Sequence, residues 1–322
     1  MSNNILIIDP GKGWGHFVSK IYSLRELSNR LNKKIIFLTK STTQAKSYLE
    51  NQDFCESVCY LSNHNGNSKN LINKIKNFLN DIKTAKNLHV NSCYIFHPSI
   101  RYVMIANFAG IKNIYGLGYK LQNFFIKKKN KFYNSFLSKV VPDDNETKEF
   151  VKKLLNLNDI EFKPFIKPDE NKKYIAVGIG ASEISKRWPI ENYIKLIEYL
   201  IHKNNNEILV VSGKDQIQDE KKIKNHFISK SVNIIFTSNK KISEVIPYMK
   251  KSKIYIGNDT GFAHLFINCS IKSYIIYGSC VPQYYSKLIN HIVHDKDVKR
   301  SETSIHTINL NKVVKSIERE FV

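Results

Sequence analysis

Short apolar runs alternate with longer amphipathic segments along most of the chain. In the first half, runs rich in β-branched and aromatic residues predict strands at 4–9, 34–39, 92–96 and 113–117. Apolar residues at helical spacing predict helices between them, at 17–31, 43–50 and 100–111. Strands that alternate with helices in this way predict a parallel sheet covered by helices.

The second half repeats the alternation after a stretch of different character. That stretch contains a basic run (127–134), a capped polar helix (142–158) and a charged segment with two prolines (162–173), which favours an interdomain linker. Further strands are predicted at 174–180, 207–213, 233–237, 253–259 and 273–278, with helices at 189–203, 216–227, 242–251 and 261–268. We therefore expect two α/β domains, 1–165 and 166–322.

Composition narrows the class of protein. With 322 residues, 42% of them hydrophobic and 24% charged, the chain is typical of a globular protein. We find no apolar run long enough to span a membrane and no secretory signal, so we expect a cytoplasmic protein. The odd number of cysteines and their spacing predict free thiols rather than disulfides or a zinc site: Cys55, Cys59, Cys93, Cys269 and Cys280.

The net charge of +22 favours acidic partners: nucleic acid, an anionic membrane surface or phosphorylated small molecules. However, 44 of the 50 basic residues are lysine. Proteins that read nucleic-acid bases, or that bind phosphate through two hydrogen bonds from one side chain, favour arginine. Charge alone therefore does not choose among these partners.

The first predicted strand is followed by a glycine-rich turn, "DPGKGWGH", which contains Gly11, Gly13, Gly15 and His16. Its G-x-G-x-G spacing differs from the dinucleotide-binding fingerprint, and no acidic residue closes the second strand, so an NAD site is not expected. Such glycines still bring backbone N–H groups close to a ligand at the start of a helix. His16 is a candidate for chemistry there, or it only begins the helix.

A second candidate site follows the strand at 174–180. The small-residue turn Ala181-Ser182 leads to Lys186-Arg187, and Pro189 opens the next helix. Cations beside a helix N-terminus favour a diphosphate site. The alternative is a set of solvated charges before a helix that begins with proline.

A third candidate is the stretch "GNDTGFAHL", where a strand ends at Asn258 and the next helix carries His264. A helix cap explains one polar residue, Asp259 or Thr260, but not the whole set. The N–H groups of Thr260 and Gly261 are expected to hold a phosphate that His264 also reaches, while Asp259 orients a sugar hydroxyl.

Two further loops follow the predicted strands at 207–213 and 273–278, at the same predicted edge of the sheet. Gly213, Asp215 and Glu220 are candidates for contact with a nucleoside, although a solvated loop explains them equally well. Gly278 and Ser279 are candidates for a place in the cleft.

The order and spacing of "GASEISKRWPIENYIKLI", "VSGKDQ", "IYIGNDTGFAHL" and "IIYGSCVP" resemble the family 9 glycosyltransferases, the ADP-heptose:lipopolysaccharide heptosyltransferases. The resemblance implies a GT-B fold, with two Rossmann-like parallel-sheet domains facing across a cleft. The acceptor would bind the N-terminal domain and the nucleotide sugar the C-terminal one. It also implies inverting transfer without a metal or other cofactor. Carried over to this chain, the donor-binding residues are Ser182, Lys186, Asp259, Thr260, Gly261 and His264.

The chain departs from the family in the first turn, where Gly15-His16 stands in place of Gly-Asp, whose acid is the proposed catalytic base. Histidine can act as a base near neutral pH, so His16 is the predicted base, oriented by Asp9.

Together these observations predict a cytoplasmic enzyme that transfers heptose from ADP-heptose onto a lipopolysaccharide-core or other surface-glycan acceptor. Aromatic and basic residues at 120–139 are a candidate contact with an anionic inner-membrane surface, or simply an exposed helix. The alternatives are a nucleotide-sugar-binding protein without transferase activity, a transferase that uses another nucleotide sugar, and, from charge alone, a nucleic-acid-binding protein. An epimerase would need an NAD fingerprint, which we do not find.

Overall fold

The computed structural model describes residues 4–11, 13–62, 71–127, 130–131, 143–203, 207–230, 232–295 and 298–321. The chain divides into two compact units, residues 1–161 and 162–322. Much of the predicted membrane-contact segment, 128–129 and 132–139, lies outside the described residues. Among the described residues, no helix is both long and apolar enough to cross a bilayer.

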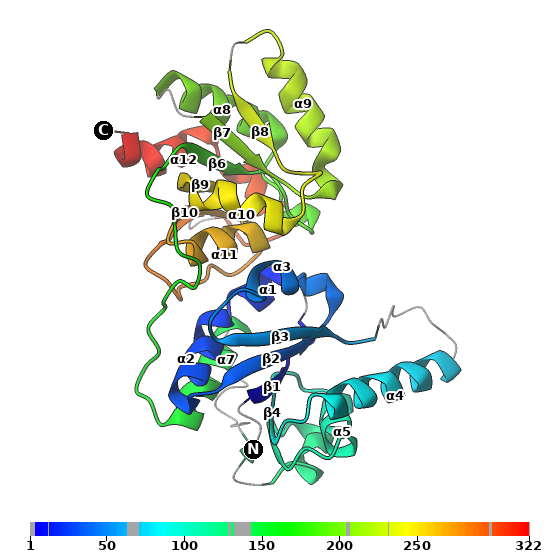
Figure 1. Ribbon diagram of the computed structural model, residues 1–322. Coiled ribbons are helices and arrows are strands. Elements are labelled where there is room, and N and C mark those ends of the chain that lie inside the picture. Colours follow the sequence, from blue (N-terminus) through cyan, green and yellow to red (C-terminus); the bar gives the residue numbers. More distant parts are fainter. Residues whose placement is uncertain are drawn as a thin grey trace. The chain divides into compact units, whose positions relative to one another are not determined.

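The first unit is built on a parallel five-stranded sheet in the order β3-β2-β1-β4-β5 (Figure 1). Its strands are β1 (Asn4–Ile8), β2 (Lys34–Thr39), β3 (Cys55–Tyr60), β4 (Ser92–Ile95) and β5 (Asn113–Gly116). The central strand β1 is buried along nearly its whole length, as expected for a strand covered on both faces. The predicted strands are confirmed, whereas β3 was not predicted from the sequence.

The helices of the first unit are α1 (Trp14–Val18), α2 (Ile21–Leu31), α3 (Lys46–Leu49), α4 (Leu71–Asn87), α5 (Ile100–Phe108) and α7 (Asp143–Leu155), with short 3-10 helices η1 (Ser41–Thr43) and η2 (Lys120–Phe124). The single helix predicted at 17–31 is wrong. It is interrupted at Ser19 and Lys20, where the Ser19 hydroxyl donates to the His16 carbonyl at 3.0 Å. The helix predicted at 43–50 is shorter because Gln44 has a left-handed backbone, with φ +50°.

The second unit has a parallel six-stranded sheet in the order β11-β10-β9-β6-β7-β8. Its strands are β6 (Tyr174–Gly178), β7 (Glu207–Val211), β8 (Ile234–Phe236), β9 (Ser252–Asn258), β10 (Lys272–Tyr277) and β11 (Ile289–Val293). Its helices are α8 (Ile190–Lys203), α9 (Ile217–Phe227), α10 (Ile242–Lys250), α11 (Gly261–Asn268) and α12 (Leu310–Ile317), with 3-10 helices η4 (Ile184–Lys186), η5 (Lys214–Gln216), η6 (Ser304–Thr307) and η7 (Glu318–Phe321). All strands and helices predicted here are confirmed, while β11 and α12 were not predicted.

The predicted linker, 162–173, contains neither helix nor strand, and it packs onto the second unit. Its Ile166 N–H donates to the Asn268 carbonyl at 2.9 Å, and Phe165 and Ile166 are both buried. The segment therefore belongs to the second unit.

In both units the strand order reverses direction beside the first strand, between β1 and β4 and between β6 and β9. Ligands of open parallel sheets bind outside the carboxyl ends of the strands at such switch points. The glycine-rich turn follows β1, and the two other predicted sites follow β6 and β9. The fold thus places the candidate chemistry of each unit at its switch point.

Candidate functional site

The turn after β9 is fixed to the neighbouring strand β6 by the side chain of Asn258, which is fully buried. Its Oδ1 accepts from the Trp188 N–H at 3.1 Å and lies 2.8 Å from the Tyr193 hydroxyl. Its Nδ2 donates to the carbonyls of Ile179 and Gly180, at 3.0 and 3.3 Å. One amide thus joins the ends of both strands and the loop that begins at Ile179.

Two glycines let these strand ends approach closely. Gly178 of β6 and Gly257 of β9 are registered partners. A Cβ atom on Gly257 would lie 2.4 Å from the Gly178 carbonyl oxygen, and one on Gly178 would lie 2.0 Å from the Tyr255 hydroxyl. That hydroxyl donates to the Asn258 carbonyl at 3.1 Å. The space that two side chains would fill is therefore occupied by a tyrosine hydroxyl and backbone.

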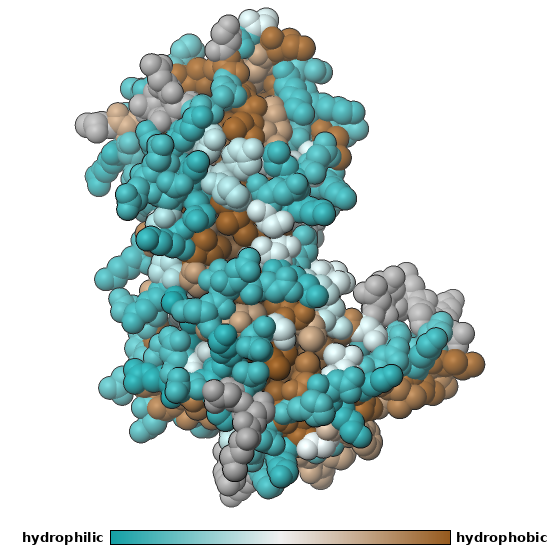
Figure 2. Space-filling model, viewed as in Figure 1, coloured by the Kyte–Doolittle hydropathy of each residue, from teal (hydrophilic) through white to brown (hydrophobic). Residues whose placement is uncertain are grey.

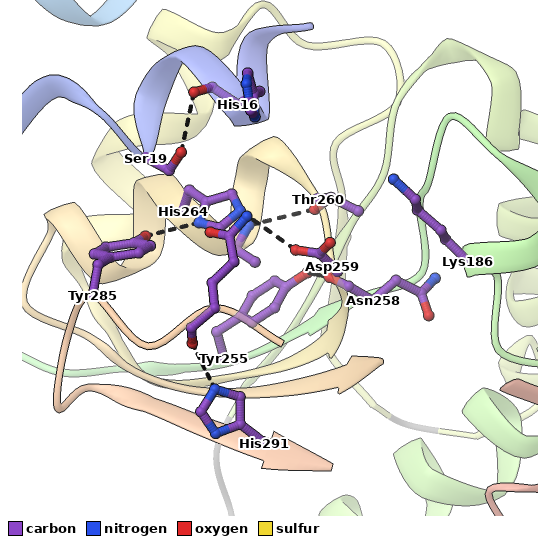
Figure 3. A network of polar contacts seen from close by, with 12 residues as sticks. His16, Ser19, Lys186, Tyr255, Asn258, Asp259, Thr260, His264, Tyr285 and His291 are labelled. Carbon is purple, nitrogen blue, oxygen red and sulfur yellow. Dashed lines mark hydrogen bonds and ion pairs between the residues drawn. The ribbon is translucent and has the colours of Figure 1, made fainter. Parts of the chain in front are cut away.

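Beyond this turn, His264 is held between two polar side chains (Figure 3). Its Nδ1 lies 2.8 Å from the Tyr285 hydroxyl, and its Nε2 lies 3.4 Å from Asp259 Oδ1. The Tyr285 contact is a hydrogen bond, whereas Asp259 Oδ1 is buried without a hydrogen-bond partner among the described residues, so its contact with His264 is electrostatic. Thr260 caps α11, with its Oγ1 accepting from the Ala263 N–H at 3.4 Å.

Lys186 lies in the loop after β6, at the end of η4, with about a fifth of its side chain exposed. Its Nζ is 3.4 Å from Glu183 Oε1. Burial lowers the pKa of Lys186, but the nearby Cys280 thiol, Asp259 and Glu183 outweigh this effect and raise it. In turn, burial raises the pKa of the Cys280 thiol. Lys186 is thus a half-buried cation beside the Cys280 side chain.

The remaining residues predicted in this unit fall into two groups. Ser182 is exposed in the loop after β6, and Gly213 lies at the start of η5, where its N–H donates to Gln216 Oε1 at 3.0 Å. Glu220 and Gly278 have roles inside the fold. Both Glu220 oxygens bind serines, because Ser212 Oγ and Ser238 Oγ donate to them and the Ser238 N–H adds a bond of 3.0 Å. These bonds account for Glu220 without a nucleoside.

Gly278 is buried and serves close packing. A Cβ atom there would lie 2.5 Å from the Ile305 Cβ and 2.9 Å from the Ser185 carbonyl oxygen. The neighbouring Ser279 hydroxyl donates to the Ser185 hydroxyl at 3.1 Å. The glycine therefore brings the end of β10 against the loop that carries Lys186, rather than lining a cleft itself.

In the first unit, Asp9 is 2% exposed and supports the glycine-rich turn. Its Oδ1 accepts from the Gly11 N–H at 3.0 Å, where Gly11 has φ +59°, and its Oδ2 lies 3.5 Å from Lys20 Nζ. Gly13 precedes α1, and Gly15 and His16 lie in its first turn. The contacts that place Asp9 thus run to the turn and to Lys20.

The arrangement in the second unit suits a phosphorylated ligand. The first N–H groups of α11, that of Gly261 among them, have no partner within the helix, and the helix dipole adds partial positive charge there. Lys186 supplies a full charge at the same edge of the sheet, while Asp259 supplies an acceptor suited to a hydroxyl group. Together they can bind an anion and orient a sugar.

Several residues at this site were not singled out from the sequence: Trp188, Tyr193, Tyr255, Cys280 and Tyr285. Trp188, Tyr193, Tyr255 and Cys280 lie in the stretches quoted for the family resemblance, and Tyr285 lies just beyond the last of them, but none was given a role at this site. The tyrosines on α8 and β9 read as ordinary core residues. Over the described ranges, no group of three or more His, Cys, Asp or Glu side chains is arranged to hold a metal ion.

Two doubly wound parallel sheets, each with a candidate site at its switch point, define a GT-B-like fold. The sequence profile of "Glycosyltransferase family 9 (heptosyltransferase)" matches residues 131–305, more than half of the chain. The chain belongs to this family, as the resemblance of its motifs predicted.

One curated relative is a lipopolysaccharide heptosyltransferase 1 from Campylobacter coli. It is 28% identical over 166 residues, which cover 47% of this chain and 48% of the relative. The match thus spans about half the length of that protein.

Solved structures share the whole fold. The ADP-heptose lipopolysaccharide heptosyltransferase II of E. coli gives a TM-score of 0.75 at 13% identity, covering 99% of this chain and 98% of that one. E. coli heptosyltransferase WaaC with ADP-2-deoxy-2-fluoro heptose gives 0.76 at 14% identity, covering 98% and 99%. These likenesses confirm the predicted GT-B fold.

Proposed function

We propose that the protein transfers heptose from ADP-heptose, with inversion, onto a lipopolysaccharide-core or other surface-glycan acceptor in the cytoplasm. Membership of family 9 supports glycosyl transfer, and the names of the C. coli and E. coli relatives support heptose as the sugar. In this proposal the second unit binds the donor and the first unit binds the acceptor.

The observation that carries the proposal is the set of polar groups around the end of β9. Lys186 and the first N–H groups of α11 receive the donor diphosphate, and His264 approaches the same anion. Asp259 accepts from a hydroxyl of the sugar. The end of β9 and His264 are fixed before the ligand arrives by Asn258 and Tyr285, so they stabilise the charge that develops on the leaving diphosphate without reorganising.

His16 acts as the base in this proposal. Its imidazole takes the proton of the acceptor hydroxyl while the acceptor oxygen forms a bond to the anomeric carbon, and the bond from that carbon to the diphosphate breaks, releasing ADP. Asp9 acts indirectly, because it holds the Gly11 turn that leads into α1 and is itself paired with Lys20.

Donor binding is tested by the rise in melting temperature that ADP produces. We expect Lys186→Ala to weaken ADP binding about tenfold or more, because it removes a charged hydrogen-bond donor. Lys195→Ala, which removes an exposed lysine from α8, is the matched control and should leave the rise intact. Wild-type protein that ADP does not stabilise would contradict the donor assignment.

Transfer is tested by the release of nucleotide diphosphate from ADP-heptose and from UDP-, GDP- and ADP-hexoses, with and without lipopolysaccharide-core acceptors. His16→Ala should lower acceptor-dependent release about 10²–10⁴-fold and leave ADP binding unchanged. Release that the substitution does not affect would exclude His16 as the base.

The presence of histidine where the family has an acid favours one alternative, a nucleotide-sugar-binding protein without transfer activity. ADP binding without release from any donor would support it. If nucleotide diphosphate is released only from a nucleotide sugar other than ADP-heptose, the protein is still a transferase, but ADP-heptose is not its donor.

A further inference from the structure

The helix α4 carries large apolar side chains that the core of its unit does not cover. Leu71, Ile72, Ile75 and Leu79 are 68%, 73%, 51% and 58% exposed. Figure 1 shows α4 running outward from the sheet, and Figure 2 shows hydrophobic residues gathered at its outer end. Four such residues within three turns of one helix form a patch, whereas scattered exposed leucines would need no explanation.

The exposed residues continue an apolar face that the core uses only in part. At 100° per residue, they share an arc about 120° wide with Phe78 and Ile82. Phe78 and Ile82 pack against the hydrophobic core of the first unit. The same face therefore serves the core in the C-terminal half of α4 and extends uncovered in the N-terminal half.

Lysines border this arc on both sides. Lys74 lies on one side of it, Lys76 and Lys83 lie on the other, and all three are exposed. The one acid of α4, Asp81, is 1% exposed and binds Arg101 Nη2 at 2.9 Å and the Ser62 N–H at 2.7 Å. The exposed surface of α4 therefore presents apolar and cationic side chains without an acidic one.

The charge of the surrounding chain points to the same kind of partner. Residues 57–142 contain thirteen lysines and arginines and a single acid, Asp81, a net charge of +12 out of +22. A helix that combines an apolar face with bordering lysines is suited to the interface of an anionic bilayer, where cations meet the phosphates and apolar side chains enter the acyl boundary. An ordinary protein partner would give no reason for so one-sided a charge.

We propose that α4 attaches the protein to an anionic lipid bilayer, lying in the interface with Leu71, Ile72, Ile75 and Leu79 inserted. Attachment needs neither donor nor acceptor, so it is independent of the proposed transfer reaction. It would bring the enzyme to a surface on which lipid-linked acceptors are held.

The segment at 120–139 adds to this contact in its described part. Leu121, Phe124 and Phe125 are exposed, at 58%, 83% and 48%. The helix α5 contacts both α4 and η2, the element that carries Leu121 and Phe124. The membrane contact predicted from the sequence is therefore extended to α4, which carries its larger apolar face.

The test is co-sedimentation of the full chain with phosphatidylcholine vesicles that contain either 30% phosphatidylglycerol, about the anionic fraction of a charged leaflet, or none. We expect binding to the anionic vesicles, and a drop of about tenfold or more in the partition coefficient of L71N/I75N, since two inserted side chains are lost. Both positions are exposed, so the fold should be unaffected. Ile228→Asn, which changes an isoleucine 83% exposed in the other unit, is the matched control.

Lys74→Gln with Lys76→Gln should weaken binding to the anionic vesicles by about thirtyfold, at about 1 kcal/mol for each cation. Equal binding of wild type and L71N/I75N, or equal binding to both kinds of vesicle, would overturn the proposal. So would sedimentation showing a dimer of the wild type that L71N/I75N dissociates, because a second copy would then cover the patch. ADP release with a soluble acceptor should be the same in L71N/I75N and wild type, which separates this test from that of the transfer reaction.

Discussion

The two units build the same strand order around their switch points but fill those points differently. In the first unit the last registered pair of β1 and β4 is Ile8 and Ile95, both fully buried. In the second unit the corresponding pair of β6 and β9 is Gly178 and Gly257. Apolar side chains fill the first position, whereas the second is left to backbone, the Tyr255 hydroxyl and Asn258.

The polar groups next to these pairs differ as well. The first unit places opposite charges together, Asp9 and Lys20, both nearly inaccessible to solvent. The second unit uses neutral groups, because burial raises the pKa values of Tyr193 and Tyr255 and keeps both hydroxyls protonated.

This difference explains where charge is available for a ligand. Lys20 is paired with Asp9 inside the fold, so its charge is not offered to a bound anion. In the second unit neutral side chains join the strand ends, and the charged residues lie beyond them, where Lys186 contacts Glu183 and Asp259 contacts His264, at 3.4 Å each. The first unit thus places a charge pair inside its scaffold, whereas the second places its charged residues at the candidate site.

The largest effect should follow from breaking the charge pair of the first unit. Lys20→Met leaves Asp9 as a buried charge without its counter-ion, and we expect a loss of about 3–5 kcal/mol in the free energy of unfolding of that unit. Hydrogen exchange followed by mass spectrometry resolves the two units and should show faster exchange in the first unit, β1 and α1 included, but not in the second.

The control for this prediction is the double variant D9N/K20M. It removes both charges and should recover most of the lost stability, since a neutral amide can still accept from the Gly11 N–H. A single variant as stable as wild type would mean that the pair contributes nothing, and the contrast between the units would then rest on the glycines alone.

A smaller effect is expected from the glycine pair of the second unit. Gly257→Ala places a Cβ atom 2.4 Å from the Gly178 carbonyl oxygen, and backbone cannot yield as a flexible side chain can. We expect a loss of about 2–3 kcal/mol in the stability of the second unit, together with weaker ADP binding.

Gly213→Ala is the matched control, because its nearest neighbour would be Gln216 Oε1 at 3.4 Å, an ordinary contact. Denaturation by urea, read from exchange in β6 and β9, measures both variants. Equal midpoints for the two would show that the strands can separate without cost.

The sequence was a good guide where pattern is local. Strands such as 34–39 have the predicted bounds because their apolar runs are continuous, as expected for strands buried on both faces. The strand β3 was missed because Glu56 and Ser57 interrupt its apolar pattern. The break between α1 and α2 was missed because side-chain contacts occur there, from Ser19 to the His16 carbonyl and from Lys20 to Asp9, and helical periodicity does not register such contacts.

The site shows the same limit. Asp259, Thr260 and His264 were predicted to lie together because they occupy one strand end and one helical turn, and the structure brings them together. Trp188 and Tyr193 lie in a stretch quoted for the family resemblance, but their contacts run to Asn258, 70 and 65 residues away, so no local pattern shows these contacts. Glu220 was a candidate for contact with a nucleoside or part of a solvated loop, and its bonds to Ser212 and Ser238 could not be seen in the sequence.

The smallest effect should come from the hydrogen bond between Tyr285 and His264 in the second unit. Tyr285→Phe removes the hydroxyl that lies 2.8 Å from His264 Nδ1 and leaves the ring in place. Losing one such hydrogen bond costs about 1 kcal/mol, so we expect the Kd for ADP to rise about fivefold. Calorimetric titration measures that change directly.

The neighbouring Tyr284→Phe is the natural comparison, because Tyr284 is 76% exposed and its hydroxyl has water as an alternative partner. An equal rise in Kd for both variants would mean that the loop responds to any lost hydroxyl, and that His264 needs no partner to bind the donor. If the Kd for ADP rises in Y285F alone, the contrast between the units extends further. Neutral groups of the second unit would then orient the His264 imidazole for ligand binding as well as join the ends of the strands.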